Sequence, residues 1–90
     1  MPPNLWYVYI LECRGGSFYT GITNDLTARL DKHNTGEGAQ WTRMRRPVKM
    51  LFAEGHPTKS SARIREIEIK GFRREKKAAL INGKTNTLRL

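Results

Sequence analysis

The fold of this chain is decided between residues 6 and 23, where the sequence reads WYVYILEC, RGGS and FYTGIT. The first run, Trp6–Cys13, and the last, Phe18–Thr23, are rich in aromatic and β-branched residues, which favour strands. Arg14–Ser17 lies between them and contains paired glycines, which reach positive φ at little cost. The stretch therefore predicts a β-hairpin. Trp6–Cys13 is apolar on both faces for most of its length, so we expect a central strand covered on both sides.

The register of this hairpin decides which side chains share a face, because residues opposite one another in an antiparallel pair point the same way. In one register Tyr9 lies opposite Gly21. Leu11 then lies opposite Tyr19, and one face carries both tyrosines together with Tyr7. A slip of one residue would put Tyr9 and Tyr19 on opposite faces. A site shared by the two tyrosines therefore predicts the first register.

Residues 24–38 have the pattern of a first helix and its end. Asn24 is a good N-cap, and Asp25 would follow it in the first turn, where the helix dipole favours an acidic side chain. One stripe at helical spacing has three members: Leu26, Leu30 and His33. Two glycines end the helix, and we expect a polar, basic loop over residues 39–47.

The second half predicts one strand and two helices. In order, the segments are a strand at Val48–Ala53, a turn at Gly55–Pro57, a helix capped by Ser60 or Ser61 and running to about Lys70, a break at Gly71 and Phe72, and a helix at Arg73–Ile81. Three strand residues should share a face: Val48, Met50 and Phe52. Residues 82–90 lack periodicity, and we expect a frayed, flexible tail there.

These elements predict an α+β fold. Their order is ββαβαα, and the three strands should form one small antiparallel sheet flanked by helices. The chain has 90 residues, with no internal repeat and no linker, so we expect a single domain over residues 1–90 with its core at about 5–81.

Charge is the strongest compositional signal. The chain has 17 Lys and Arg against 8 Asp and Glu, a net charge of +9, and a pI near 10.3. Residues 1–42 carry three basic and four acidic residues, whereas residues 43–90 carry fourteen basic and four acidic ones. So basic a chain indicates a nucleic-acid partner, with a functionally silent basic surface as the alternative. A membrane surface is disfavoured, because no basic helix has bulky apolar anchors.

The cysteine count, the hydropathy and the absence of certain motifs exclude several classes of protein and of site. Cys13 is the one cysteine, which excludes an internal disulfide and fits the reducing cytoplasm. No apolar run approaches the ~20 residues of a membrane helix, and the N-terminus does not resemble a secretory signal. No phosphate-binding Gly-x-x-x-x-Gly-Lys loop is present, and His33, His56 and Cys13 cannot form a structural zinc site.

Glu66 is the carboxylate that most needs an explanation. At helical spacing it shares a face with Ala62 and Ile69, and a carboxylate on a core-facing stripe costs free energy unless it has a partner or a metal ion. An intrahelical ion pair with Arg63 or Lys70 is one explanation, and a metal ion is the other.

Arg29, His33 and the two tyrosines each have a structural and a chemical interpretation. Arg29 could clamp phosphate oxygens or be a solvated helix arginine, and His33, one turn later, could be a catalyst or a partner of the helix dipole. Tyrosine is also a favourable strand residue. A phenol with a pKa of about 10 could act as a base only beside Arg29 or a cation that favours the phenolate.

Taken together, these residues resemble the GIY-YIG endonuclease superfamily, and within it the small stand-alone bacterial single-domain proteins. Tyr7–Tyr9 and Tyr19–Gly21 match the two name motifs, and Arg29 and His33-Asn34 match the first helix. Residues 36–47, the Glu66 helix and residues 76–81 resemble the rest of the domain. The sequence departs from the family pattern at four places: Tyr7, Thr20, Ile22-Thr23 and Ala78.

The resemblance implies divalent-metal-assisted hydrolysis of a phosphodiester, with DNA as the expected substrate. Glu66 would hold one Mg²⁺ or Mn²⁺. Tyr9 would act as, or relay to, the general base, and Tyr19 would hydrogen-bond the water or the phosphate. Arg29 would stabilise the developing charge, and His33 would bind phosphate or take a proton from Tyr9.

Nucleic-acid backbone contacts would come from six basic residues: Arg43, Arg45, Arg46, Lys70, Arg73 and Arg74. Such contacts do not read sequence, so we expect structure-selective or weakly selective cleavage, or a protein partner that supplies targeting. Two other functions stay open, a nucleic-acid-binding module without turnover and a scaffold whose charge serves a protein partner.

Overall fold

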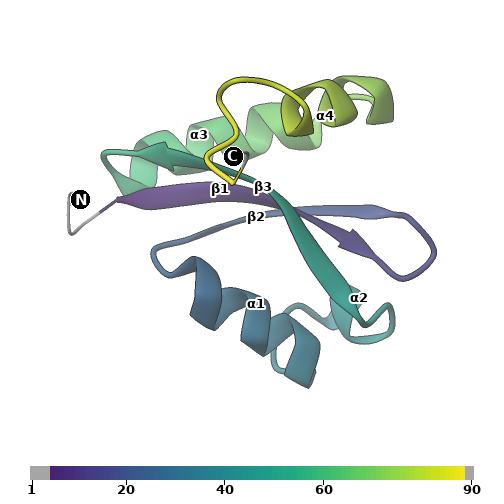
Figure 1. Cartoon of the computed structure of the whole chain (residues 1–90). Helices are drawn as coiled ribbons and strands as arrows, with labels where there is room; N and C mark the ends of the chain where they lie inside the picture. The colour runs from purple at the N-terminus through teal and green to yellow at the C-terminus, as the bar shows by residue number, and fades with distance from the viewer. Residues whose placement is uncertain (1–4, 89–90) are drawn as a thin grey trace.

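A three-stranded antiparallel sheet organises the computed structural model, which describes residues 5–88 (Figure 1). The elements in chain order are β1 (Trp6–Cys13), β2 (Phe18–Thr23), α1 (Leu26–Thr35), α2 (Gln40–Arg43), β3 (Val48–His56), α3 (Lys59–Lys70) and α4 (Arg74–Ile81). The strand order is β2-β1-β3, so β1 is central as predicted. The predicted α+β fold is confirmed, with one short helix, α2, added where the sequence indicated a loop.

The hairpin has the register that a shared tyrosine face requires. Tyr9 pairs with Gly21, and Leu11 pairs with Tyr19. The turn uses Gly15 and Gly16, both at φ 92°, in the left-handed region that glycine adopts without strain. Both tyrosines therefore project from the same face of the sheet.

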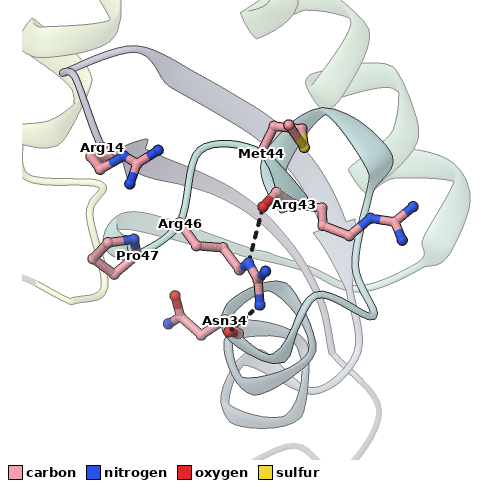
Figure 2. A pocket seen from close by; sticks show the side chains of 6 residues that line it. All are labelled: Arg14, Asn34, Arg43, Met44, Arg46 and Pro47. Carbon is pink, nitrogen blue, oxygen red and sulfur yellow. Dashed lines mark hydrogen bonds between the residues drawn. The ribbon is translucent and has the colours of Figure 1, made fainter.

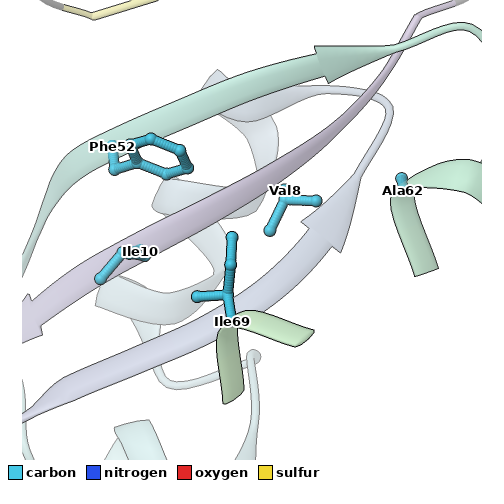
Figure 3. Packing of buried hydrophobic residues seen from close by; sticks show 5 residues of the cluster. All are labelled: Val8, Ile10, Phe52, Ala62 and Ile69. Carbon is cyan, nitrogen blue, oxygen red and sulfur yellow. The ribbon is translucent and has the colours of Figure 1, made fainter. Parts of the chain in front are cut away.

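Helices cover both faces of the sheet, with α3 and α4 on one side and α1 and α2 on the other (Figure 1). Beneath α3 lies a cluster of five buried residues: Val8, Ile10, Phe52, Ala62 and Ile69 (Figure 3). Beneath α1 lies a second cluster: Tyr9, Leu11, Cys13 and Val48. The sheet thus separates two small cores, and Tyr9 belongs to the core on the α1 side.

Strand β3 differs from the prediction in its length and in the faces of the sheet to which its side chains point. It runs to His56, through the residues where a turn was expected. A bulge interrupts its pairing with β1, because Ile10 pairs with Phe52 whereas Leu11 pairs with Met50. The extra residue, Leu51, reverses the alternation of side chains. The prediction that Val48, Met50 and Phe52 share one face is therefore wrong, since Phe52 packs in the α3 core.

Helix caps lie one to three residues from their predicted positions. Asp25, not Asn24, caps α1 and accepts a hydrogen bond from the Ala28 backbone at 3.0 Å. Thr58 caps α3, and its hydroxyl and that of Ser61 form a reciprocal capping box. In both places the residue chosen from the sequence lies within three residues of the true cap, which has similar capping chemistry.

The segment after α4 packs against β3, so the expectation of a frayed tail is wrong as far as residue 88. Asn86 is buried, and its side-chain amide donates to the carbonyls of Leu51 and Ile81, each at 2.8 Å. Its side-chain oxygen accepts from the Ala53 backbone at 3.2 Å, and the Thr87 backbone donates to the Ala53 carbonyl at 2.8 Å. The remainder of the predicted tail, residues 89–90, lies outside the described residues.

Candidate active site

A buried hydrogen-bond chain joins the hairpin to α1 and α2. The Tyr9 hydroxyl lies 3.0 Å from His33 Nε2, and His33 Nδ1 lies 2.7 Å from the Thr42 hydroxyl. The Thr42 hydroxyl donates in turn to the Ala39 carbonyl at 2.8 Å. Tyr9, His33 and Thr42 are each at most 2% exposed. A tyrosine and a histidine that the sequence singled out are thus directly bonded inside the protein.

Tyr19 also packs against the His33 ring. The two ring centroids are 5.3 Å apart in an edge-to-face arrangement. The indole of Trp41 stacks on Tyr19 at 5.9 Å, and the guanidinium of Arg45 lies 4.0 Å from the centre of that indole. Trp41 and Thr42 are consecutive residues of α2, so this one short helix contacts both Tyr19 and His33.

Two glycines allow the close packing of this site. A Cβ atom on Gly21 would lie 2.5 Å from the Tyr9 hydroxyl oxygen, and one on Gly38 would lie 2.5 Å from His33 Nδ1. Real Cβ atoms do not approach other atoms so closely. Gly21 therefore gives the phenol its place across β2, and Gly38 lets the chain pass tightly over the imidazole.

Arg29 and Glu66 are the other two predicted catalytic residues, and they affect Tyr9 and Tyr19 through their charges. Among residues 5–88, no hydrogen bond or ion pair joins either of them to Tyr9 or Tyr19. Their charges nonetheless act on both phenols, because Arg29 favours and Glu66 disfavours the phenolate. Arg29 comes from α1, one turn before His33, whereas Glu66 comes from α3 on the opposite layer.

The environment keeps the three ring side chains uncharged. Burial raises the pKa of Tyr9 strongly, and the neighbouring Tyr19 adds to the effect. Burial also raises the pKa of Tyr19, with a further contribution from Glu66. Burial lowers the pKa of His33, and the positive charge of Arg29 acts in the same direction. At neutral pH the site therefore holds two phenols and a neutral imidazole.

Glu66 has the burial that the sequence predicted and both of the ion-pair partners. It is 4% exposed and lies with Ala62 and Ile69 on the buried side of α3. Arg63 binds one carboxylate oxygen, and Lys70 Nζ lies 3.4 Å from the other. The side chains of Arg63 and Lys70 are themselves 58% and 51% exposed. The helix itself thus compensates this carboxylate with two solvent-exposed cations.

Glu66 fits a metal site in which one protein carboxylate binds the ion and the other ligands come from water and substrate. Within residues 5–88, no group of three or more His, Cys, Asp or Glu side chains converges on a point, so a cage made wholly of protein ligands is not formed there. Mg²⁺ commonly binds through one or two carboxylates, with waters and substrate phosphates as its other ligands. Glu66 suits that arrangement, since its cationic partners reach it from solvent.

The predicted nucleic-acid residues fall into two groups. Arg43 and Arg46, with Arg14, line an open pocket of about 540 Å³ at the end of α2 (Figure 2). Arg46 is held there by the Arg43 and Asn34 carbonyls, at 3.0 and 3.3 Å. No carboxylate lines this pocket. The arrangement gives the pocket a strongly positive lining.

The other four predicted residues lie outside the lining of this pocket. Arg45 covers Trp41, Lys70 pairs with Glu66, and the guanidinium of Arg74 lies 4.0 Å from the centre of the Phe18 ring. Arg73 is exposed at the start of α4. Of the six predicted residues, Arg43 and Arg46 therefore line the pocket, and the role of all six in binding nucleic acid stays a prediction.

Sequence reasoning missed four residues around the site: Arg14, Gly38, Trp41 and Thr42. Arg14 was assigned to a turn, and the other three fell in or beside the supposed loop. The available signal was the isolated Trp41, since a tryptophan in a polar, basic stretch generally packs against something.

Comparison with known proteins identifies the family. Residues 5–79 match the sequence profile described as the GIY-YIG catalytic domain. This chain belongs to the GIY-YIG family. Its relatives include the UPF0213 protein of Staphylococcus saprophyticus, 50% identical over 76 residues that cover 84% of this chain and 93% of the relative. A UPF0213 protein of Staphylococcus aureus is 51% identical over 75 residues, covering 83% and 92% of the two chains.

Two solved structures are similar to this chain over most of its length. The solution structure of a UPF0213 protein from Bacillus halodurans is 42% identical, with a TM-score of 0.58 over 93% of this chain and 89% of that one. A protein from E. faecalis is 38% identical, with a TM-score of 0.59 over 87% and 83% of the two chains. The close relatives are thus small bacterial proteins of similar length. No helix in the described part of this chain is long and apolar enough to cross a membrane.

Proposed function

We propose that this protein is a divalent-metal-dependent endonuclease that hydrolyses phosphodiester bonds, with DNA as its substrate and with structural or low sequence selectivity. The observation that carries this proposal is the buried hydrogen bond between the Tyr9 hydroxyl and His33 Nε2. Burial favours the protonated phenol, so Tyr9 alone is a poor base. A neutral imidazole at 3.0 Å supplies the acceptor that the phenol needs.

In this reaction Tyr9 takes a proton from the attacking water while its own proton moves to His33 Nε2. The hydrogen bond is already made, so no side chain has to reorganise before the transfer. Tyr19 would orient the water or the scissile phosphate. Arg29 would stabilise the negative charge that develops on the phosphate oxygens.

Glu66 is the residue that would hold the metal ion, Mg²⁺ or Mn²⁺. A bound ion would neutralise charge on the phosphate and on the leaving oxygen. Arg63 and Lys70 would then have to release the carboxylate. Both side chains are mostly exposed. They would therefore lose little buried surface if they moved away from Glu66.

The basic residues would contact phosphates away from the scissile bond. The pocket lined by Arg14, Arg43 and Arg46 suits a backbone phosphate, because guanidinium groups bind phosphate oxygens in pairs. Lys70, Arg73, Arg74 and Arg45 would add further contacts without reading sequence. A cytoplasmic location and a protein partner that supplies targeting belong to the same proposal.

The decisive experiment compares Glu66→Gln with Glu68→Gln on a panel of linear, nicked, flapped and branched DNAs with Mn²⁺. Glu68 is a matched control, since it lies on the same helix but is exposed and paired with Arg65. Glu66→Gln should abolish cleavage and leave DNA binding intact, and Glu68→Gln should cleave normally. Cleavage by Glu66→Gln at the wild-type rate would contradict the proposal.

A second candidate is a nucleic-acid-binding module without turnover. It is favoured by the two ion pairs of Glu66, which satisfy the carboxylate without a metal ion. In that case the wild-type protein would bind the DNA panel and cleave none of it with either ion. Equal loss of binding and folding in Glu66→Gln would then show that Glu66 has a structural role.

A further inference from the structure

The Thr42 hydroxyl is the one group that contacts His33 Nδ1 through a hydrogen bond in the described part of the chain. Thr42 is fully buried, and His33 is 1% exposed. The imidazole therefore has one protein partner at each ring nitrogen, Thr42 at Nδ1 and Tyr9 at Nε2. Which nitrogen carries the proton must follow from what these partners can donate and accept.

A threonine hydroxyl has a single hydrogen to donate. The Thr42 oxygen lies 2.8 Å from the Ala39 carbonyl, which can only accept. That contact takes the hydroxyl hydrogen, and such bonds to the carbonyl one turn earlier are common for threonine in helices. The Thr42 oxygen is then an acceptor toward His33, and the 2.7 Å contact requires a hydrogen on Nδ1.

We propose that Thr42 is a positioning residue that fixes neutral His33 as the Nδ1–H tautomer and so keeps Nε2 open to the proton of Tyr9. In the opposite tautomer Thr42 would have to donate to Nδ1. Its oxygen and that of Ala39 would then face each other at 2.8 Å without a hydrogen between them. The two oxygens would repel each other at that distance, so this tautomer is disfavoured.

The same contact serves both states of the proton transfer. After Nε2 receives the Tyr9 proton, both ring nitrogens are donors. Nδ1–H still donates to Thr42, and the new Nε2–H donates to the Tyr9 oxygen. No partner has to rotate. Gly38 supports this geometry, because its backbone passes so close to Nδ1 that a Cβ there would lie 2.5 Å away.

The tautomer is measured directly by ¹⁵N NMR of the imidazole ring, in a His56→Gln background. The chain has two histidines, so this background leaves one set of ring signals. Wild-type and Thr42→Ser, which keeps the hydroxyl, should show a protonated Nδ1 and an unprotonated Nε2 at neutral pH. Thr42→Val has the same shape without the hydroxyl, and it should move the proton to Nε2 in part or in full.

The inference about rate rests on the proposed nuclease activity, whereas the tautomer does not. Thr42→Val should lower kcat about tenfold or more with KM little changed, and Thr42→Ser should restore it. Nε2–H in the folded wild-type protein, or Nδ1–H retained in Thr42→Val, would overturn the proposal. If the wild-type protein cleaves no DNA, the proposed function fails while the ring signals still decide the role of Thr42.

Should Thr42→Val fail to fold, Thr42→Ser and the wild-type protein carry the test. Their ring signals must then agree with each other, and both must show the proton on Nδ1. A serine variant with its proton on Nε2 would overturn the role of the hydroxyl.

Discussion

The Tyr9 ring lies across Gly21, its partner on the neighbouring strand. A Cβ atom at Gly21 would be 2.5 Å from the phenol oxygen and 2.7 Å from the ring carbon that bears it. The glycine is therefore part of the site although it offers no functional group. Because Gly21 has no side chain, the Tyr9 ring can lie over it and its hydroxyl can reach His33.

Gly21→Ala should disconnect Tyr9 from His33. The methyl group would force the phenol aside, and such overpacking of a core costs about 1–3 kcal/mol. The cleavage rate should fall by more than the loss of folding free energy would explain, because Tyr9 loses its proton acceptor. Urea unfolding and single-turnover cleavage measure the two effects separately.

Gly55→Ala is the matched control for that substitution. Gly55 lies on β3 opposite Tyr7, and a Cβ there would meet the end of the Leu5 side chain at 3.3 Å. Leu5 can turn away, so stability and cleavage should change little. An equal loss in both alanine variants would mean that the sheet tolerates no added methyl group, and the specific role of Gly21 would be refuted.

Protonation of His33 should stop the reaction on the acid side. Burial and the charge of Arg29 lower the pKa of this imidazole, and Tyr9 and Tyr19 offer no negative charge to offset them. Cleavage should therefore persist below pH ~6.5, the ordinary value for histidine, and fall only at lower pH. Proton NMR titration of the ring should give a midpoint below that value. A midpoint at or above it would contradict the buried, neutral imidazole.

The same pKa difference predicts how stability depends on pH. Because the folded pKa of His33 lies below the unfolded one, the unfolded chain binds more protons in the interval between them. The free energy of unfolding should be unaffected by His33 above pH ~6.5 and should decrease as pH falls toward the folded pKa. Urea unfolding at a series of pH values, compared with His33→Gln, isolates this contribution.

Thr20→Val should stabilise the protein. The Thr20 hydroxyl is buried, and it has no hydrogen-bond partner among residues 5–88. Valine keeps the shape and removes the unpaired oxygen, so we expect a gain of about 1 kcal/mol. Thr20→Ser, which keeps the hydroxyl and removes the methyl group, should lower stability. Thermal unfolding would disprove the assignment if the order of the two variants were reversed.

Asn86→Ala should loosen the C-terminal segment from β3. Its side chain bonds the backbone at Leu51, Ala53 and Ile81, and its loss should cost about 1–3 kcal/mol because buried backbone groups lose their partner. Hydrogen exchange at the Ala53 amide should accelerate. Asn82→Ala, which removes one exposed side-chain bond, is the control and should have a small effect.

Salt dependence tests the arginine pocket. If Arg14 and Arg43 bind phosphates, alanine at either position should reduce the slope of log affinity against log salt by about one contact. Lys49→Ala removes an equal charge from an exposed position on β3 and should leave the slope nearer to the wild-type value. Equal slopes in all three variants would place the bound phosphate elsewhere.

Much of the site could be predicted because its residues lie at regular spacings. The hairpin register followed from where Tyr9 and Tyr19 must point if they act together, and the burial of Glu66 followed from the helical interval between Ala62 and Ile69. Each inference used only local geometry, with period two for strands and 3.6 for helices.

The features that could not be predicted depend on contacts distant in sequence. Helix α2 has four residues and no side-chain cap at Ala39, so it carries neither periodicity nor a start signal. The bulge at Leu51 has no glycine or proline to mark it. Asn86 appears polar and unremarkable in sequence, and its role depends on meeting β3 more than thirty residues away.

The bulge and Asn86 together affect which backbone groups of β3 are free to pair with another strand. β3 is an edge strand, and exposed edges recruit strands from neighbouring copies. The bulge leaves the Leu51 carbonyl outside the ladder, where the Asn86 amide binds it. Asn86 and Thr87 also occupy the Ala53 amide and carbonyl. A short return of the chain thus occupies the outward backbone groups at the middle of this edge, so a strand from another copy could not pair there without displacing Asn86 and Thr87.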